Sequence, residues 1–284
     1  MTRGVADGRI ALPAALLEAI ARDADRARAA RAVLDLELHH VARGAPAGAA
    51  TAIVLKGPAV ARRWPDPELR PYGDIDLLVP ESELGDWATA LERLGFAPPA
   101  EREARRSRLA HHHLVYRRGS IALELHWRLF AAREARRLDY SALAAHAVAD
   151  RELGGLLVAS LPAQLVVLAV HLAHHRDATR RLVWTLDFVT LGEADAVAEA
   201  RRLAEAWGVR WALEAALHDV ETVLGEPRWG ASPERVGGLA RARRSGAGRW
   251  RTRAAKVRAI GVRRAVRYAK NRVRARRTGG SGDR

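Results

Sequence analysis

The chain has 284 residues, of which 49% are hydrophobic and 29% are charged, a balance typical of a globular protein with a buried core. It contains no cysteine, which excludes disulfide partners, thiolate zinc sites and cysteine nucleophiles and favours an intracellular protein. The net charge is +15, but residues 241–277 hold 16 Lys and Arg and no acidic residue, which leaves about −1 for the rest.

Two further features bear on location. The N-terminal stretch acquires charged residues too early to be a signal peptide. The longest apolar stretch, Leu161–Ala173, has 13 residues and is too short to cross a bilayer. We therefore expect a cytoplasmic protein, with the basic tail as a route to peripheral contact with a membrane surface.

The first part of the chain is predicted to be helical. Its apolar residues recur every three or four positions, as one or two amphipathic helices require: Leu16, Ile20, Ala24, Ala27, Ala30, Leu34, Leu38 and Val41. The small residues at 44–50 (GAPAGAA) end this pattern.

Strands and helices alternate in the next part of the chain. Thr51–Leu55 is predicted to be a short buried strand, and Pro58 to begin a helix, since proline is tolerated at the first helical position. A proline-rich loop leads to a second predicted strand, Asp74–Val79. Ser82–Leu94 has the apolar spacing of a helix, and Gly95 is a typical stop signal.

The remaining segments predict two hairpins and several helices. Residues 111–117 and 120–127 flank Gly119 as the two arms of a hairpin, and Arg151–Ser160 predicts another around two glycines. Four later segments have helical patterns: Leu161–His175, Arg181–Leu191, Ala194–Trp207 and Arg210–Leu224.

This order of elements predicts an α+β fold. A small mixed β-sheet core with flanking helices precedes a helical domain and a basic tail. The predicted parts are an N-terminal helical segment, the sheet core, the helical domain and a helical or disordered tail, at residues 1–50, 51–130, 131–230 and 231–284.

Candidate metal ligands stand in the second strand, within GDIDLLVP at 73–80. Because side chains alternate along a strand, Asp74 and Asp76 share one face, with their Cα atoms roughly 7 Å apart. Carboxylates at this spacing can hold Mg²⁺, and two such ions serve phosphoryl transfer. A turn followed by a solvated aspartate is the alternative, because the pattern Asp-x-Asp is common.

A third carboxylate lies in the second arm of the first hairpin. In residues 121–127 (IALELHW) the apolar side chains occupy one face, whereas Glu124 and His126 occupy the other. A neighbouring strand could bring Glu124 beside the two aspartates, where bound cations would neutralise the repulsion. A surface glutamate on a half-exposed strand is the alternative.

The turn after the first strand is the candidate phosphate-binding element. Gly57 lets the backbone approach a ligand closely, and a helix beginning after it would offer free amides to phosphate. Lys56 adds a cation that could hold a triphosphate, although a solvated lysine is the alternative.

These motifs, LKG at 55–57, then RPYGDIDLLV at 70–79 and LELHW at 123–127, resemble the bacterial uncharacterised nucleotidyltransferase family of the DNA polymerase β-like superfamily. The resemblance implies that Asp74 and Asp76 are metal ligands, that Glu124 completes the triad, and that Lys56 and Gly57 form the nucleotide-phosphate turn. It also implies a nucleotidyltransferase core at 51–130, with two Mg²⁺ ions as cofactors and Mn²⁺ as the alternative.

Two departures from the broader superfamily concern the phosphate turn. Pro58 stands where the superfamily has serine or glycine, and sixteen residues separate Gly57 from Asp74, which is longer than usual. Arg70 in this loop is the best candidate for an additional phosphate contact, because a guanidinium pairs bidentately with phosphate.

The histidines and one buried acid add further candidates. His113 and His126 are candidates for contacts with the acceptor or the base, and His126 could also orient a carboxylate, whereas a polar strand edge is the alternative for His113. Asp187 lies in an apolar helical segment, where a buried carboxylate needs a partner, and Arg180 or Arg181 is predicted to supply it.

The expected function is metal-dependent transfer of a nucleoside monophosphate from an NTP to an unidentified acceptor (a small molecule, peptide or protein), with release of pyrophosphate. The alternative is a catalytically inactive nucleotidyltransferase fold that recruits RNA or a protein partner through its basic tail. Residues 241–277 could instead contact an anionic membrane, or remain a disordered, solvated tail.

Overall fold

The computed structural model describes residues 13–48, 51–101, 103–104, 112–129, 137–174 and 182–231. The basic residues 241–277 lie outside these ranges, and with them the predicted contacts with RNA or a membrane, as do Arg180 and Arg181. Within the described ranges, no helix combines the length and the apolar character needed to span a membrane.

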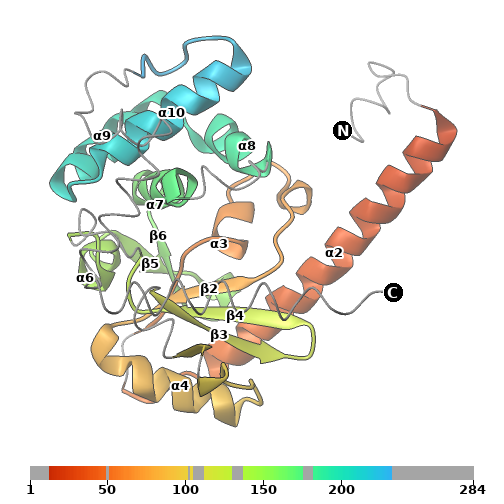
Figure 1. Cartoon of the computed structure of the whole chain (residues 1–284), viewed down its shortest axis with the longest axis vertical. Coiled ribbons are helices and arrows are strands. Elements are labelled where there is room, and N and C mark those ends of the chain that lie inside the picture. The colour runs from red at the N-terminus through yellow and green to blue at the C-terminus, as the bar shows by residue number, and fades with distance from the viewer. Residues whose placement is uncertain are drawn as a thin grey trace, which may run out of the picture.

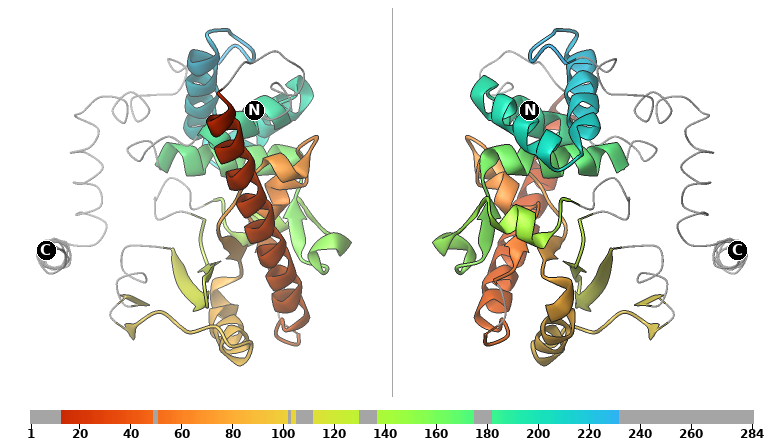
Figure 2. Two further views of the ribbon diagram at one scale, coloured as in Figure 1. Left: turned by 90° about the vertical axis from the view of Figure 1, so that its right-hand side faces the viewer. Right: turned by 90° about the vertical axis from the view of Figure 1, so that its left-hand side faces the viewer.

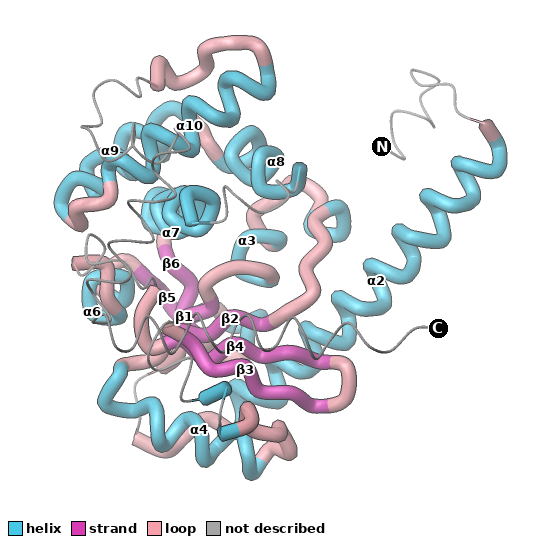
Figure 3. The backbone as a smooth tube through the Cα atoms, viewed as in Figure 1, coloured by secondary structure: helices cyan, strands magenta, loops and turns pink. Residues whose placement is uncertain are grey.

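The predicted α+β fold is confirmed, as a central mixed sheet lies between helices on both sides (Figures 1 and 3). The six strands are β1 (Ile53–Val54), β2 (Ile75–Leu78), β3 (His113–Arg118), β4 (Ile121–His126), β5 (Ala147–Ala149) and β6 (Leu157–Ala159). Their order across the sheet is β3-β4-β2-β1-β6-β5. The β1–β6 and β2–β4 pairs are parallel, and the β1–β2, β3–β4 and β5–β6 pairs are antiparallel.

Alternating side chains give the sheet two buried faces. On one face Ile75, Leu77 and Val79 join a core with residues of α2 (Ala14–Arg43) and α4 (Leu84–Arg93). On the other face Leu78 and Ile53 join the core of the helical half of the chain. Since Asp76 alternates with Ile75 and Leu77, it faces the same side of the sheet as Leu78.

The N-terminal segment forms one continuous helix, α2, of 30 residues. Only its C-terminal part packs on the sheet, through Leu34, Leu38 and Val41 among others. Its N-terminal half extends away from the body of the protein (Figure 1), and in the left view of Figure 2 the helix lies in front of the rest of the protein. The helix ends at Arg43, and its C-cap Gly44 begins the predicted small-residue stretch.

The helical half of the chain is built around α7 (Leu161–His174), whose apolar side chains are buried nearly all round. The helices α8 (Leu182–Leu191), α9 (Ala194–Ala206) and α10 (Arg210–Leu224) pack around it. Of two short helices, α3 (Pro58–Ala61) lies between the sheet and α8, and α6 (Tyr140–Ala144) lies beside strands β5 and β6 (Figure 1).

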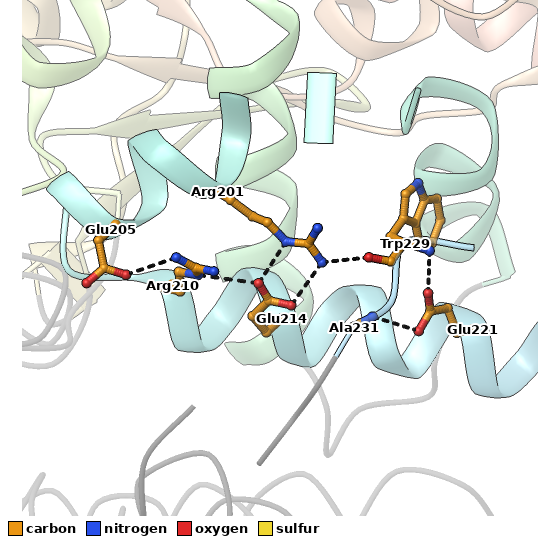
Figure 4. A network of polar contacts seen from close by, with 7 residues as sticks. All are labelled: Arg201, Glu205, Arg210, Glu214, Glu221, Trp229 and Ala231. Atoms are coloured by element: carbon orange, nitrogen blue, oxygen red, sulfur yellow. Dashed lines mark hydrogen bonds and ion pairs between the residues drawn. The ribbon is translucent and has the colours of Figure 1, made fainter. Parts of the chain in front are cut away.

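A polar network connects α9, α10 and the segment that follows α10 (Figure 4). Arg201 donates to both oxygens of the buried Glu214 and to the carbonyl oxygen of Trp229. Glu221 accepts hydrogen bonds from the backbone N–H groups of Trp229 and Ala231. These bonds satisfy buried polar groups and hold residues 225–231 against α9 and α10.

The sheet extends beyond the predicted core boundary at residue 130, because β5 and β6 complete the same six strands. The second predicted hairpin is present, but its first arm begins earlier, and Arg151–Leu153 is a 3-10 turn instead of a strand. The Asp150 side chain accepts the Glu152 N–H and so stabilises this turn, and Gly154 ends it in a left-handed conformation.

Candidate active site

The register of the sheet assembles a polar site on the face toward the helical half. In the parallel β2–β4 pair, Asp76 lies directly opposite Glu124. His126 stands two residues beyond Glu124 and therefore on the same face, and His113 of β3 lies directly opposite His126. Three neighbouring strands thus direct two carboxylates and two imidazoles to one place.

Short contacts connect these side chains around Asp76, which is only 1% exposed. The Lys56 Nζ lies 3.0 Å from the Asp76 Oδ1. The His126 Nε2 lies 3.1 Å from the same Oδ1 and 3.2 Å from the Glu124 Oε2. One buried imidazole nitrogen therefore stands between two carboxylates, and an ammonium group balances their charge.

The protonation states follow from this arrangement. Burial alone would raise the pKa of Asp76, but Lys56 and His126 outweigh it and hold that pKa far below its ordinary value. Burial would likewise raise the pKa of Glu124, yet the hydrogen bond from His126 lowers it. Burial would lower the pKa values of Lys56 and His126, and the surrounding carboxylates raise both instead. The site thus keeps two carboxylates charged.

Backbone contacts place Lys56 at the end of β1. The Leu55 N–H donates to the Asp76 carbonyl oxygen at 3.0 Å, which ties this end of β1 to β2. The fully buried Gln164 of α7 donates its Nε2 to the Leu55 carbonyl oxygen at 2.6 Å. The backbone next to Lys56 is therefore fixed both to the sheet and to the helical half. No local pattern in the sequence identified Gln164.

Asp74 occupies a different position from Asp76. It precedes β2 and is half-buried, whereas Asp76 is enclosed. Its charge contributes to the raised pKa of Lys56, so it lies near the same ammonium group. The described residues whose ligand atoms lie within 4.8 Å of an Asp76 oxygen and of one another are Glu124 and His126, and Asp74 is not in this group.

The turn at Gly57 requires glycine. Its φ of 52° and ψ of −112° belong to a region that other residues rarely adopt. A Cβ atom here would lie 3.3 Å from both the Asp74 carbonyl oxygen and the Tyr72 ring. The helix α3 that follows has only four residues, so the expected phosphate attraction of a helix N-terminus is weak here.

Arg70, the predicted phosphate contact, is 4% exposed and already holds a carboxylate. Its Nε and Nη2 donate to the two oxygens of Asp187 at 2.7 and 2.8 Å, and its Nη1 lies 3.5 Å from the Gly57 carbonyl oxygen. Arg70 and Trp64 are thus partners of Asp187 that the sequence did not predict, and the predicted partners Arg180 and Arg181 lie outside the described residues. Burial raises the pKa of Asp187, and these donors oppose the shift.

The described residues fit a divalent cation at Asp76. Its Oδ2 is buried and has no hydrogen-bond partner among the described residues. A buried carboxylate oxygen without a partner is costly, and a cation would supply one. Asp76 and Glu124 offer the oxygen ligands that Mg²⁺ prefers, and Lys56 would then share Asp76 with the ion.

The sequence alone does not single out His112, a third histidine at this site. Its ring lies 5.1 Å from that of His113 and 5.4 Å from that of His126, measured between centroids. It stands in a run of three histidines, and only the three-dimensional arrangement distinguishes it from its neighbours.

A family model described as an uncharacterised nucleotidyltransferase matches residues 5–225. The match covers the sheet, the site and the helical half, and it ends at the residue after α10. No curated protein matches the chain, and no solved structure does.

Proposed function

The chain belongs to the uncharacterised nucleotidyltransferase family, and on this premise we propose that it transfers a nucleoside monophosphate from an NTP to an acceptor. In this reaction an acceptor oxygen bonds to the α-phosphorus, while the bond to the oxygen that bridges the α- and β-phosphates breaks. Pyrophosphate leaves with the electron pair of that bond, and the acceptor proton passes to a base of the site.

One observation carries the proposal: Asp76 and Glu124 lie opposite each other on parallel strands, with a buried Asp76 oxygen that has no hydrogen-bond partner among the described residues. Such a pair supports a divalent-cation site. Asp76, Glu124 and Asp74 would hold the ions, which when bound neutralise charge on the phosphates and the attacking oxygen.

The surrounding residues support distinct roles in this reaction. Lys56 would hold the triphosphate, since its ammonium group remains charged and its side chain is 19% exposed. Glu124 would receive the acceptor proton, because its side chain is 26% exposed and can be approached. His126 would orient both carboxylates through its Nε2.

For Arg70 we propose a positioning role in place of a direct phosphate contact. Its guanidinium donates to Asp187 through two nitrogens, and the third lies near the Gly57 carbonyl oxygen. It would thus hold the backbone of the proposed phosphate turn at Gly57 in place and link that turn to α8.

The test is a transfer assay with each of the four NTPs labelled at the α-phosphate, Mg²⁺ and cell extract. We expect the wild-type protein to label an acceptor. Asp76→Asn should lower the rate at least about a thousandfold, because metal stabilisation of phosphoryl transfer contributes several kcal/mol. Circular dichroism checks that the variant is folded.

The matched control is Asp86→Asn, because Asp86 is an exposed residue in the first turn of α4. Labelling by the control should equal that of the wild type. Undiminished labelling by Asp76→Asn would refute the proposal. If the wild type neither labels an acceptor nor binds NTP with Mg²⁺ in calorimetry, the catalytically inactive binding module becomes the better description.

A further inference from the structure

Three histidines form a compact group beside the carboxylates. The ring centroids of His112, His113 and His126 lie 4.8 to 5.4 Å apart. A ligand nitrogen from each of the three lies within 4.8 Å of the others, so one ion can be reached by all of them after small rotations. Imidazole nitrogens are common ligands of transition metals.

The backbone brings these rings together. His113 and His126 are direct partners in the antiparallel β3–β4 pair, so their side chains leave the same face. The Trp127 N–H donates to the His112 carbonyl oxygen at 3.2 Å, which extends the ladder by one more bond. The two arms of a hairpin thus fix the positions of all three residues, as a metal site requires.

A carboxylate adjoins the three histidines. The Glu124 Oε2 lies 3.7 Å from the His113 Nε2 and 3.2 Å from the His126 Nε2. The Nδ1 of His126 is buried without a hydrogen-bond partner among the described residues, and the residue is 4% exposed. A buried ring nitrogen without a partner is costly, and metal binding would give it one.

We propose that His112, His113 and His126 form a transition-metal site beside the carboxylate pair, in which the Nδ1 of His126 binds the ion while its Nε2 keeps its contacts with Asp76 and Glu124. Three imidazole nitrogens favour borderline ions such as Co²⁺ or Zn²⁺ over Mg²⁺, which takes oxygen ligands. This site goes beyond the proposed nucleotidyl transfer, because it does not require the protein to bind a nucleotide.

Co²⁺ is the probe, because its visible absorption reports the number and type of its ligands. We expect the full-length protein to bind Co²⁺ more tightly than Mg²⁺ in a competition titration. The bound Co²⁺ should show an intense visible absorption band, as is typical of a low coordination number with nitrogen ligands. The double variant His112→Gln/His113→Gln replaces the two less buried ligands and should weaken Co²⁺ binding at least about tenfold. Loss of a residue that only hydrogen-bonds to a metal ligand already costs that much.

The matched control is His218→Gln on α10, a partly buried histidine outside the group, and it should leave the spectrum unchanged. Circular dichroism and thermal unfolding check the fold of each variant. Pulsed EPR with Mn²⁺ gives a second readout, because imidazole nitrogens bound to the ion produce their own couplings.

Equal Co²⁺ affinity in the wild type and the double variant would overturn the proposal, as would a wild-type spectrum that shows oxygen ligands alone. The transfer assay with labelled NTP and Mg²⁺ is a separate measurement. A negative result for Co²⁺ binding would therefore not contradict nucleotidyl transfer. A negative result for transfer would not contradict the histidine site.

Discussion

Lys56 is an unusual residue in this chain. Of its 48 Lys and Arg residues only three are lysine, and the other two stand at 256 and 270. The structure shows why a compact ammonium group suits position 56, since its Nζ is 3.0 Å from a carboxylate that is almost fully buried. A planar guanidinium would need more space and would present a different geometry.

At this position we predict a loss of substrate binding. Lys56→Met removes the cation that would hold the triphosphate, so the KM for NTP should rise about ten- to a hundredfold, as expected for one hydrogen bond to a charged group. Steady-state transfer rates with labelled NTP measure this. Lys56→Arg is the control and should retain more affinity than Lys56→Met; an unchanged KM in Lys56→Met would contradict the phosphate role.

Gly57 allows a second prediction at the same scale. Gly57→Ala should lower the free energy of unfolding by about 1–3 kcal/mol, because its backbone conformation is strained for other residues. The added Cβ would also press on the Asp74 carbonyl oxygen, so transfer should decrease. The control is Gly73→Ala, where a Cβ meets nothing within 4 Å. Equal urea-unfolding curves for the two variants would exclude this account.

Among the elements, α2 packs closely against the connection between β5 and β6. The helix reaches the sheet only through its C-terminal part, where Ala42 lies against Gly154. A Cβ at Gly154 would come within 2.6 Å of the Ala42 Cβ. The connection thus approaches the helix more closely than a side chain permits.

We therefore predict that Gly154→Ala destabilises the protein more than Gly155→Ala. Both glycines have positive φ angles, 69° and 86°, so the two substitutions share the backbone strain. At Gly155 a Cβ meets nothing within 4 Å, and the difference isolates the contact with α2. We expect that difference to be about 1–3 kcal/mol in urea unfolding, the usual cost of overpacking. A larger loss in Gly155→Ala would disprove the close packing.

At the scale of the whole molecule, one buried ion pair connects the sheet half to the helical half. Arg70 follows the 3-10 turn Pro67–Leu69, and Asp187 lies in α8, 117 residues away in the chain. Trp64 donates to the same carboxylate at 3.0 Å. The loop between α3 and β2 is thus attached to the helical half by charged hydrogen bonds.

We predict strong coupling across this connection. Arg70→Met and Asp187→Leu should each lower the free energy of unfolding by about 3–5 kcal/mol, because each leaves a buried charge without its partner. The double variant should lose much less than the sum of the two. A double-mutant cycle in urea measures the coupling.

The exposed pair Arg128–Glu81 is the control for that cycle, since its side chains are 62% and 57% exposed. Its coupling should be about 0–1 kcal/mol, as is usual at a surface. If the Arg70–Asp187 coupling is equally small, the ion pair does not hold the two halves together.

The sequence by itself determined the elements and the faces of the strands. Alternation in residues 73–80 and 121–127 set Asp76 and Glu124 apart from their apolar neighbours, because side-chain direction along a strand follows from local geometry. The hairpin at Gly119 and the later helices were predictable for the same reason, since turn residues and apolar spacing act over short distances.

Only the tertiary structure decided which of these residues meet. The pairing of Asp76 with Glu124 depends on the register of two parallel strands, which long-range packing sets and no local pattern specifies. The same holds for Arg70, which appeared in the sequence as a phosphate ligand and lies buried against Asp187. A charged side chain pairs with the groups that the fold places beside it. Here the packing of the sheet against α7 and α8 determines which groups those are.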